Sequence, residues 1–178
     1  MSTQDEGLTY HGELPCTLAP LVEPLSAAAL QRLDEANELL LKALLGMDEK
    51  HDLDESDAVA QELKRQDLKL NLILDLLSTL LQQQQLRPAP VELRFSTDNL
   101  SLREDVSLAP ESPCLVSLYL DPRLPRPLQL AGVASEPPAP GWTRVHLKGL
   151  GQAVADNLDK FIFRHHRRQV AAQQKRSN

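Results

Sequence analysis

The chain has 178 residues, a net charge of −6 and a hydrophobic fraction of 42%, with only 3% aromatic residues. These values allow one or two domains whose core is built mainly from leucine and valine. Residues 1–86 carry 6 Lys+Arg against 16 Asp+Glu, a balance of −10, and residues 87–178 carry 13 against 9, a balance of +4. The negative total and the scarcity of aromatic residues argue against nucleic-acid binding. The asymmetry suggests two regions with different partners, or with each other as partners.

The sequence disfavours zinc-binding, disulfide-rich, secreted and membrane-spanning proteins. The two cysteines, Cys16 and Cys114, belong to neither a CxxC motif nor a Cys/His cluster, so neither a zinc site nor a disulfide framework is indicated. The N-terminus is acidic where a signal peptide is basic and then apolar. No apolar run approaches the roughly 18 residues that span a bilayer. We therefore expect a cytoplasmic protein without membrane insertion.

The first half of the chain is predicted to be helical after an irregular N-terminal arm. Residues 1–24 contain three prolines and form this arm. Ser26 can cap a first helix, and Gly46 is suited to end it. After an acidic linker at 48–57, Ser56 or Asp57 caps a longer helix that runs to about residue 85, before a proline-rich segment. Residues 25–86 are thus a predicted helical oligomerisation region.

The second half, residues 87–178, is predicted to be a small β-barrel with a C-terminal helix. Five stretches, at 91–95, 100–104, 114–120, 127–134 and 143–148, form short strands separated by proline-bearing loops. In VELRF, for example, apolar and charged residues alternate with the period of a half-buried strand. A final helix covers about 152–173. The expected fold class is α+β: an N-terminal helical hairpin, then a small antiparallel barrel closed by the last helix.

The longer helix carries an apolar stripe at alternating steps of four and three. The stripe consists of Val59, Leu63, Gln66, Leu70, Ile73, Leu77 and Leu80. This is the spacing of a coiled-coil seam with one polar interruption, which can set register. Leucines at 72, 74, 76 and 81 widen the stripe beyond what two strands cover, which favours a bundle. The first helix is expected to cover one side and a second molecule another. The alternative is that the sheet covers this face within one chain.

No motif for catalysis is present. The sequence lacks a P-loop, a dinucleotide fingerprint, a nucleophile elbow and HExxH. The adjacent His165 and His166 would point about 100° apart on a helix and cannot easily chelate one ion. We expect no enzyme activity, no metal and no cofactor.

The last helix, DNLDKFIFRHHRRQVAAQQKR, has acids near its start and only basic charges from Lys160 onward. Leu158 and Ile162, with His165, make a face that can close a barrel mouth. The basic side chains Arg164, Arg167, Arg168, Lys175 and Arg176 can hold phosphates through forked donors. Alternatively, the helix is a solvated one whose charges match its dipole, or it docks on the acidic N-terminal half.

The strand TRVHLKGL followed by the helix DNLDKFIFRHHRRQ resembles the end of PilZ domains, the bacterial cyclic di-GMP receptors. The leading helices, with their heptad pattern, resemble an atypical branch of that family whose members assemble into tetramers. The resemblance implies a non-enzymatic signalling or adaptor protein that acts by protein–protein interaction, and it favours a tetramer. It also implies cyclic di-GMP as the candidate ligand.

The family's nucleotide site uses an RxxxR motif and a D/N-x-S-x-x-G motif, and both are degenerate in this chain. Arg87 is followed four residues later by Val91, and the second motif reads RFSTDN. The resemblance therefore implies weak or absent binding at the standard site. The alternative is a receptor that uses a degenerate site with the C-terminal arginines. The candidate ligand residues are Arg87, Arg94, Ser96, Asn99, Arg164, Arg167 and Arg168.

Overall fold

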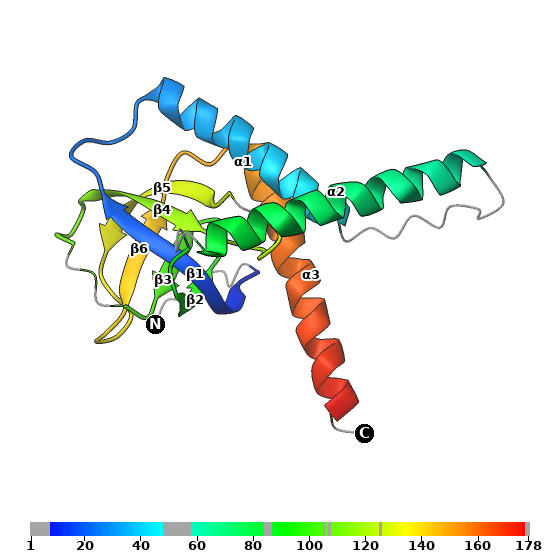
Figure 1. Ribbon diagram of the computed structural model, residues 1–178. Helices are drawn as coiled ribbons and strands as arrows, with labels where there is room; N and C mark the ends of the chain where they lie inside the picture. Colours follow the sequence, from blue (N-terminus) through cyan, green and yellow to red (C-terminus); the bar gives the residue numbers. More distant parts are fainter. Residues whose placement is uncertain are drawn as a thin grey trace.

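A closed six-stranded barrel and three helices make up the fold, as seen in a computed structural model that describes residues 8–47, 58–83, 87–104, 106, 108–124 and 126–176 (Figure 1). In chain order the elements are β1 (Tyr10–Pro20), α1 (Ala27–Met47), α2 (Ala58–Gln83), β2 (Pro90–Phe95), β3 (Asn99–Leu102), β4 (Pro113–Leu118), β5 (Leu128–Ser135), β6 (Thr143–Leu147) and α3 (Gln152–Arg176). The predicted α+β class, with a barrel and a C-terminal helix, is confirmed.

The barrel strands follow the order β1-β2-β3-β6-β5-β4, and every neighbouring pair is antiparallel. Side chains alternate between the barrel interior and its outer face, since successive residues of a strand point to opposite sides. In β5 every second residue from Leu128 is buried. The interior is packed mainly with aliphatic side chains, among them Leu93, Leu100, Leu102, Val116, Leu118, Leu130 and Val145, each at most 1% exposed.

The prediction of an irregular N-terminal arm is wrong for residues 10–20, which form β1 and close the barrel. The first half of β1 pairs with β2 and the second half with β4. Pro15 lies where the partner changes and Pro20 at the end of the strand, so neither proline interrupts a continuous ladder. Barrel residues therefore come from both ends of the sequence, not from 87–178 alone.

Helix α1 begins as predicted, with the Ser26 Oγ accepting a hydrogen bond from the Ala29 backbone N–H at 3.3 Å. It continues through Gly46 to Met47, so Gly46 lies inside the helix rather than at a left-handed end. The helix packs against α3 and β5. The expectation that it covers one side of α2 is therefore wrong, because its buried face is already taken by the barrel domain.

Asn37 fixes α1 to the barrel. This 4% exposed side chain donates from Nδ2 to the Gln129 carbonyl at 2.7 Å and accepts at Oδ1 from the Gln129 N–H at 3.1 Å. Strand β6 pairs with β5 only from Gly132 onward, so the Asn37 amide substitutes for a neighbouring strand beside Gln129. The asparagine that interrupts the apolar face of α1 is thus a docking residue.

Helix α3 closes the barrel through the face predicted for it, since Leu158 and Ile162 are fully buried. An aromatic cluster reinforces this contact. The Tyr10 ring of β1 lies 4.8 Å from the Phe95 ring, 6.1 Å from Phe161 and 4.2 Å from His165, measured between centroids. Three of the six aromatic residues of the chain are gathered here. The C-terminal half of α3 runs on beyond the barrel (Figure 1).

Helix α2 has no such cover. Its N-terminal half extends well beyond the rest of the molecule, and no part of the described chain packs along it (Figure 1). The alternative in which the sheet shelters this helix within one chain is therefore wrong for the described residues. The predicted caps, Ser56 and Asp57, lie outside those residues, as does the predicted end near 85. None of the helices in the described ranges is both long and apolar enough to cross a membrane.

Candidate functional site

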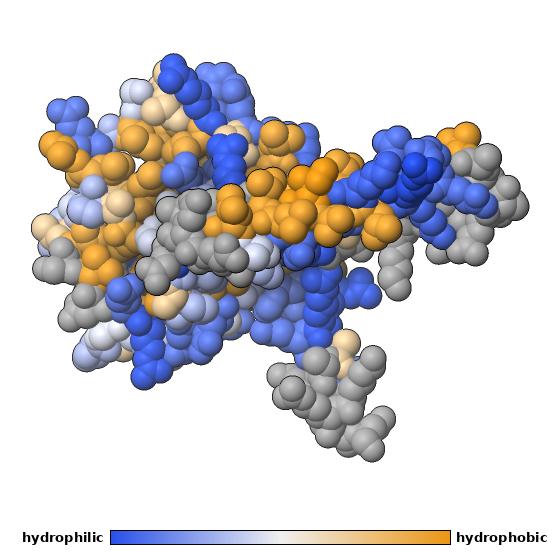
Figure 2. All heavy atoms as spheres, in the orientation of Figure 1, coloured by the Kyte–Doolittle hydropathy of each residue, from blue (hydrophilic) through white to orange (hydrophobic). Residues whose placement is uncertain are grey.

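The leucine-rich surface of α2 is the most prominent exposed hydrophobic feature. All apolar members of the predicted seam are open to solvent: Val59 is 65% exposed, Leu63 51%, Leu70 58%, Ile73 52%, Leu77 46% and Leu80 52%. Gln66, the polar interruption, is also exposed. Figure 2 shows the band of hydrophobic atoms along the helix. Monomeric proteins rarely expose an apolar patch of this extent unless it binds something.

The neighbouring side of the same helix is apolar too. Leu68, Leu72 and Leu76 are 72%, 58% and 60% exposed. Burial of each leucine contributes about 1.5–3 kcal/mol, so a partner that covered only the seam would leave much of this free energy unused. The surface of α2 is wide enough to contact more than one other helix.

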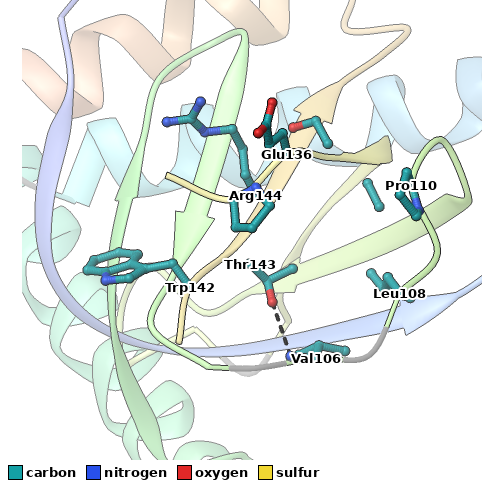
Figure 3. Close-up of a pocket in the computed structure, with 10 residues that line it drawn as sticks. Val106, Leu108, Pro110, Glu136, Trp142, Thr143 and Arg144 are labelled. Atoms are coloured by element: carbon teal, nitrogen blue, oxygen red, sulfur yellow. Dashed lines mark hydrogen bonds between the residues drawn. The ribbon is translucent and has the colours of Figure 1, made fainter. Parts of the chain in front are cut away.

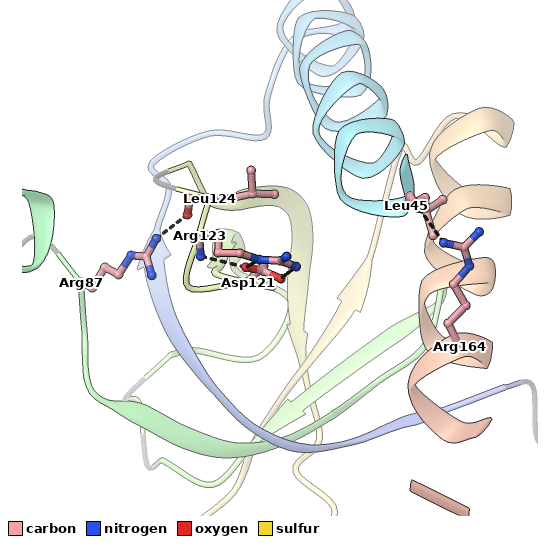
Figure 4. Close-up of polar contacts among 6 residues, drawn as sticks. All are labelled: Leu45, Arg87, Asp121, Arg123, Leu124 and Arg164. Atoms are coloured by element: carbon pink, nitrogen blue, oxygen red, sulfur yellow. Dashed lines mark hydrogen bonds and ion pairs between the residues drawn. The ribbon is translucent and has the colours of Figure 1, made fainter. Parts of the chain in front are cut away.

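The predicted ligand residue Arg87 is held by the barrel itself (Figure 4). Its Nη2 donates to the Leu124 carbonyl, and its guanidinium lies 5.5 Å from the Tyr119 ring centroid. Beside it, Arg123 and Asp121 form an ion pair of 2.7 Å. The pKa of Asp121 is lowered: burial alone would raise it, but hydrogen bonds from Arg123 and the charges of Arg123 and Arg87 outweigh that. Arg87 therefore acts as part of a structural charge cluster.

Ser96 and Asn99 lie together, as predicted, in the turn between β2 and β3. The Ser96 Oγ accepts from the backbone N–H groups of Asp98 at 3.2 Å and Asn99 at 3.3 Å. Asn99 Oδ1 lies 3.2 Å from His146 Nδ1. Asn99 does not adopt a positive φ, so the turn forms without the glycine-like conformation. The Ser96 side chain thus shapes the turn, and the Asn99 side chain connects it to β6.

The C-terminal arginines do not converge on that turn. Arg164 Nη1 donates to the Leu45 carbonyl at 2.6 Å, which satisfies the end of α1 (Figure 4). The guanidinium of Arg167 lies 5.9 Å from the Phe163 ring centroid, and Arg168 is exposed on the same helix.

Acidic groups lie near the turn instead. The pKa of Asp159 is raised, first by burial and then by the negative charges of Asp156 and Asp98. A raised carboxyl pKa caused partly by other carboxylates marks a locally negative environment. The region around Ser96–Asn99 is thus poorly suited to an anion.

His165 links α3 to β1 and makes this contact sensitive to pH. Its pKa is lowered from the ordinary 6.5, first by burial, against an opposing hydrogen bond with the His11 backbone, and then by the charges of Arg168 and His166. Its Nε2 is buried and has no hydrogen-bond partner among the described residues. Protonation would therefore place a charge and an unsatisfied N–H against the Tyr10 ring.

We expect stability to fall as the pH is lowered from 6.5 through the depressed pKa of His165, because the unfolded chain binds the proton more readily than the folded one. Above 6.5 this contribution is fully present. Denaturant unfolding at pH 7.5 and pH 5.5 measures the loss. His165→Phe should show a smaller loss over the same interval, and an equal loss in both proteins would contradict the assignment.

A cavity of about 560 Å³ lies at one end of the barrel, between the β3–β4 and β5–β6 connections (Figure 3). It is lined by Val106, Leu108, Pro110, Ala134, Ser135, Glu136, Pro137, Trp142, Thr143 and Arg144. Thr143 of β6 fixes the β3–β4 connection, which forms one wall of the cavity. Its hydroxyl donates to the Glu104 carbonyl at 2.7 Å and accepts from the Val106 N–H at 3.1 Å. The predicted Arg94 lies at its edge, with its guanidinium 4.9 Å from the Trp142 ring centroid.

Sequence reasoning missed this cavity because its walls come from segments far apart in the chain. The available signals were the single tryptophan and the arginine in the strand TRVHLK. No cluster of three or more His, Cys, Asp or Glu side chains suited to a metal occurs within the part of the chain that the structure describes.

Similar proteins inform the interpretation of both the exposed α2 surface and the candidate ligand residues. The sequence model of the atypical PilZ domain, described as a cyclic di-GMP receptor, matches residues 41–176. A solved structure of a pathogenic protein from Xanthomonas campestris is similar with a TM-score of 0.74 and 27% identity, over 93% of this chain and 91% of that chain. It is described as a new tetrameric PilZ domain self-assembled via an unusual helical bundle. No curated protein matches the sequence. The resemblance drawn from the final strand and helix is confirmed.

Proposed function

Because the chain belongs to the atypical PilZ domain family, we propose that it is a non-enzymatic adaptor that self-associates through α2. It acts in bacterial cyclic di-GMP-linked regulation, in the cytoplasm, by binding other proteins. The observation that carries this proposal is the exposed apolar seam of α2, which no part of the described chain covers. A second copy of the same helix is a chemically matched cover, since it presents the same heptad stripe.

A four-chain assembly is the favoured form. The apolar surface of α2 is broader than a two-stranded seam, which supports a bundle of helices over a dimer. The Xanthomonas campestris protein is described as a tetramer built through a helical bundle, and the two chains are similar over almost their whole length. Such an assembly displays several barrels at once, so weak contacts with a protein partner gain avidity without any new chemistry.

The proposal includes weak or absent nucleotide binding at the standard family site. The first motif retains only Arg87, whose guanidinium already binds the Leu124 carbonyl. In the second motif Arg94 stands in the place of the acid and lies against Trp142. The alternative receptor, which would use Arg164, Arg167 and Arg168, has less support because Arg164 is engaged with α1 and Asp98 of the turn interacts with the acidic Asp159 of α3.

Light scattering and native mass measurement test the assembly directly. Four chains of 19.8 kDa give about 79 kDa, and we expect this mass at micromolar concentration. A monomer of 19.8 kDa under these conditions would remove the main support for the proposal. A stable dimer would retain the α2 seam but reject the four-chain bundle. Because the seam is apolar, the mass should not fall when salt is raised from 0.1 to 1 M.

A further inference from the structure

The C-terminal half of α3 presents a second exposed surface, separate from the seam of α2. One side of this half is attached to β1, because the His165 ring lies 4.2 Å from the Tyr10 ring, between centroids, and Gln169 Nε2 donates to the His11 carbonyl at 3.1 Å. Figure 1 shows the helix extending away from the barrel and from α1 beyond these contacts. The side that faces away from β1 is therefore open to a partner.

Three residues make up this outward side, and we call them the α3 stripe: Phe163, Arg167 and Val170. At 100° per residue they fall within an arc of about 60°, roughly opposite His165 and Gln169. Phe163 is 50% exposed, Val170 is 39% exposed, and Arg167 is exposed between them. The two apolar side chains lie two turns apart, about 10 Å along the helix axis.

Arg167 and Phe163 are ordered against each other. The Arg167 guanidinium lies 5.9 Å from the Phe163 ring centroid and forms no ion pair with any residue that the structure describes. This contact fixes both side chains before a partner arrives, which lowers the entropic cost of binding. Arginine and aromatic side chains are also enriched in protein–protein interfaces. The stripe is thus a preorganised contact with a positive charge that is not neutralised.

The charge around the stripe indicates the sign of its partner. Residues 160–176 contain six Lys+Arg and no Asp or Glu, a balance of +6, whereas residues 1–159 contain 13 against 25, a balance of −12. Lys160, His166 and Arg168 are exposed beside the stripe. Opposite potentials on two surfaces favour their association and exclude partners of the wrong charge. A partner of this end of α3 should therefore be acidic.

We propose that the α3 stripe docks an acidic amphipathic helix of a partner protein. Phe163 and Val170 pack against apolar side chains one to two turns apart on that helix, and Arg167 pairs with its carboxylates. The inference rests on the proposed adaptor function and gives the chemistry of the protein that the adaptor binds.

The same observations disfavour a lipid surface and a nucleic acid. Two partly exposed apolar side chains are far less than the broad apolar face with which an interfacial helix enters a bilayer. The negative balance of residues 1–159 would be repelled by anionic headgroups and by nucleic-acid phosphates. A slender partner such as a single helix contacts the end of α3 without approaching the rest of the chain.

A designed peptide tests the proposal with the full-length protein. The probe is a fluorescently labelled peptide of three LEELAEE heptads, which presents a leucine stripe on an acidic helix, and its binding is followed by anisotropy. We expect saturable binding that weakens when salt is raised from 0.1 to 0.5 M, because exposed charges are then screened. A matched peptide with alanine in place of leucine should bind at least tenfold more weakly, since it offers nothing to Phe163 and Val170.

Variants locate the binding on α3. Arg167→Glu and Phe163→Ala should each weaken the acidic peptide at least tenfold. Lys148→Glu is the matched charge control, because Lys148 is an exposed cation outside α3, and it should change the affinity less than twofold. Trp142 emission, compared with wild type, checks that the barrel of each variant remains folded.

The proposal is overturned if the acidic peptide does not bind, if the alanine peptide binds as tightly, or if Arg167→Glu retains full affinity. Tighter binding to phosphatidylglycerol-containing vesicles or to an oligothymidylate would also overturn it and assign the surface to lipid or nucleic acid. A smaller assembly mass for Phe163→Ala would instead make the stripe an interface between copies. In the wild-type protein, an intact tetramer that ignores the peptide rejects only the stripe, and a monomer that binds it rejects only the scaffold.

Discussion

Replacing Leu70 and Leu77 by aspartate is expected to convert the proposed assembly into monomers. Each substitution removes about 1.5–3 kcal/mol of apolar burial and places a carboxylate inside the seam. A loss of about 4 kcal/mol per chain corresponds to roughly a thousandfold weaker association. Light scattering at micromolar concentration should then give a single-chain mass. The barrel should remain folded, because neither side chain packs against it.

A control places a carboxylate on the polar side of α2. Asn71 is exposed there, away from both the seam and the side formed by Leu68, Leu72 and Leu76, so Asn71→Asp should leave the mass unchanged. Trp142 emission reports whether the barrel of each variant is native. Dissociation by the control as well would show that added negative charge, rather than the seam, controls assembly.

Asn37→Ala is expected to destabilise the fold by about 2–4 kcal/mol. The substitution removes two hydrogen bonds and leaves the Gln129 N–H and carbonyl without their partner in a partly buried position. Leaving a buried donor or acceptor unsatisfied costs about 1–3 kcal/mol for each group. Denaturant unfolding at pH 7.5, followed by Trp142 fluorescence, measures the difference.

Gln31→Ala is the control on the same helix. Gln31 also donates from a side-chain amide, to Glu35 at 3.0 Å, but on the exposed face of α1. Its loss should change the free energy of unfolding by no more than about 0.5 kcal/mol. Equal effects of the two variants would mean that Asn37 contributes only helix propensity and does not dock α1 on the barrel.

Much of the fold was predictable from local patterns. The apolar alternation of residues 91–95 and 127–134 predicted β2 and β5, and Ser26 predicted the start of α1, because each signal depends on residues close in sequence. Strand β1 was not predicted. Its sequence, YHGELPCTLAP, contains two prolines, and its partners β2 and β4 lie some 70 or more residues away.

The positions of the candidate ligand residues also depend partly on local sequence and partly on contacts between distant segments. Ser96 and Asn99 were predicted together and do lie in one turn, because they are near in sequence. Arg87 and Arg164 were predicted for one site, but each binds a different backbone carbonyl, of Leu124 and Leu45. Which carbonyl lies within reach of an arginine depends on helix and loop placement, which no short motif encodes.

The sequence by itself determined that α2 has an excess of apolar surface, since the leucine count and its heptad spacing require only helical geometry. Only the tertiary structure decided that α1 packs against α3 and β5, so that the seam of α2 stays uncovered within one chain. The register of the barrel strands also placed Arg94, Arg144 and Ser135 in one row across neighbouring strands, which the sequence alone does not show. The physical reason is that periodicity is a local property, whereas strand register and helix docking depend on contacts between residues far apart in the chain.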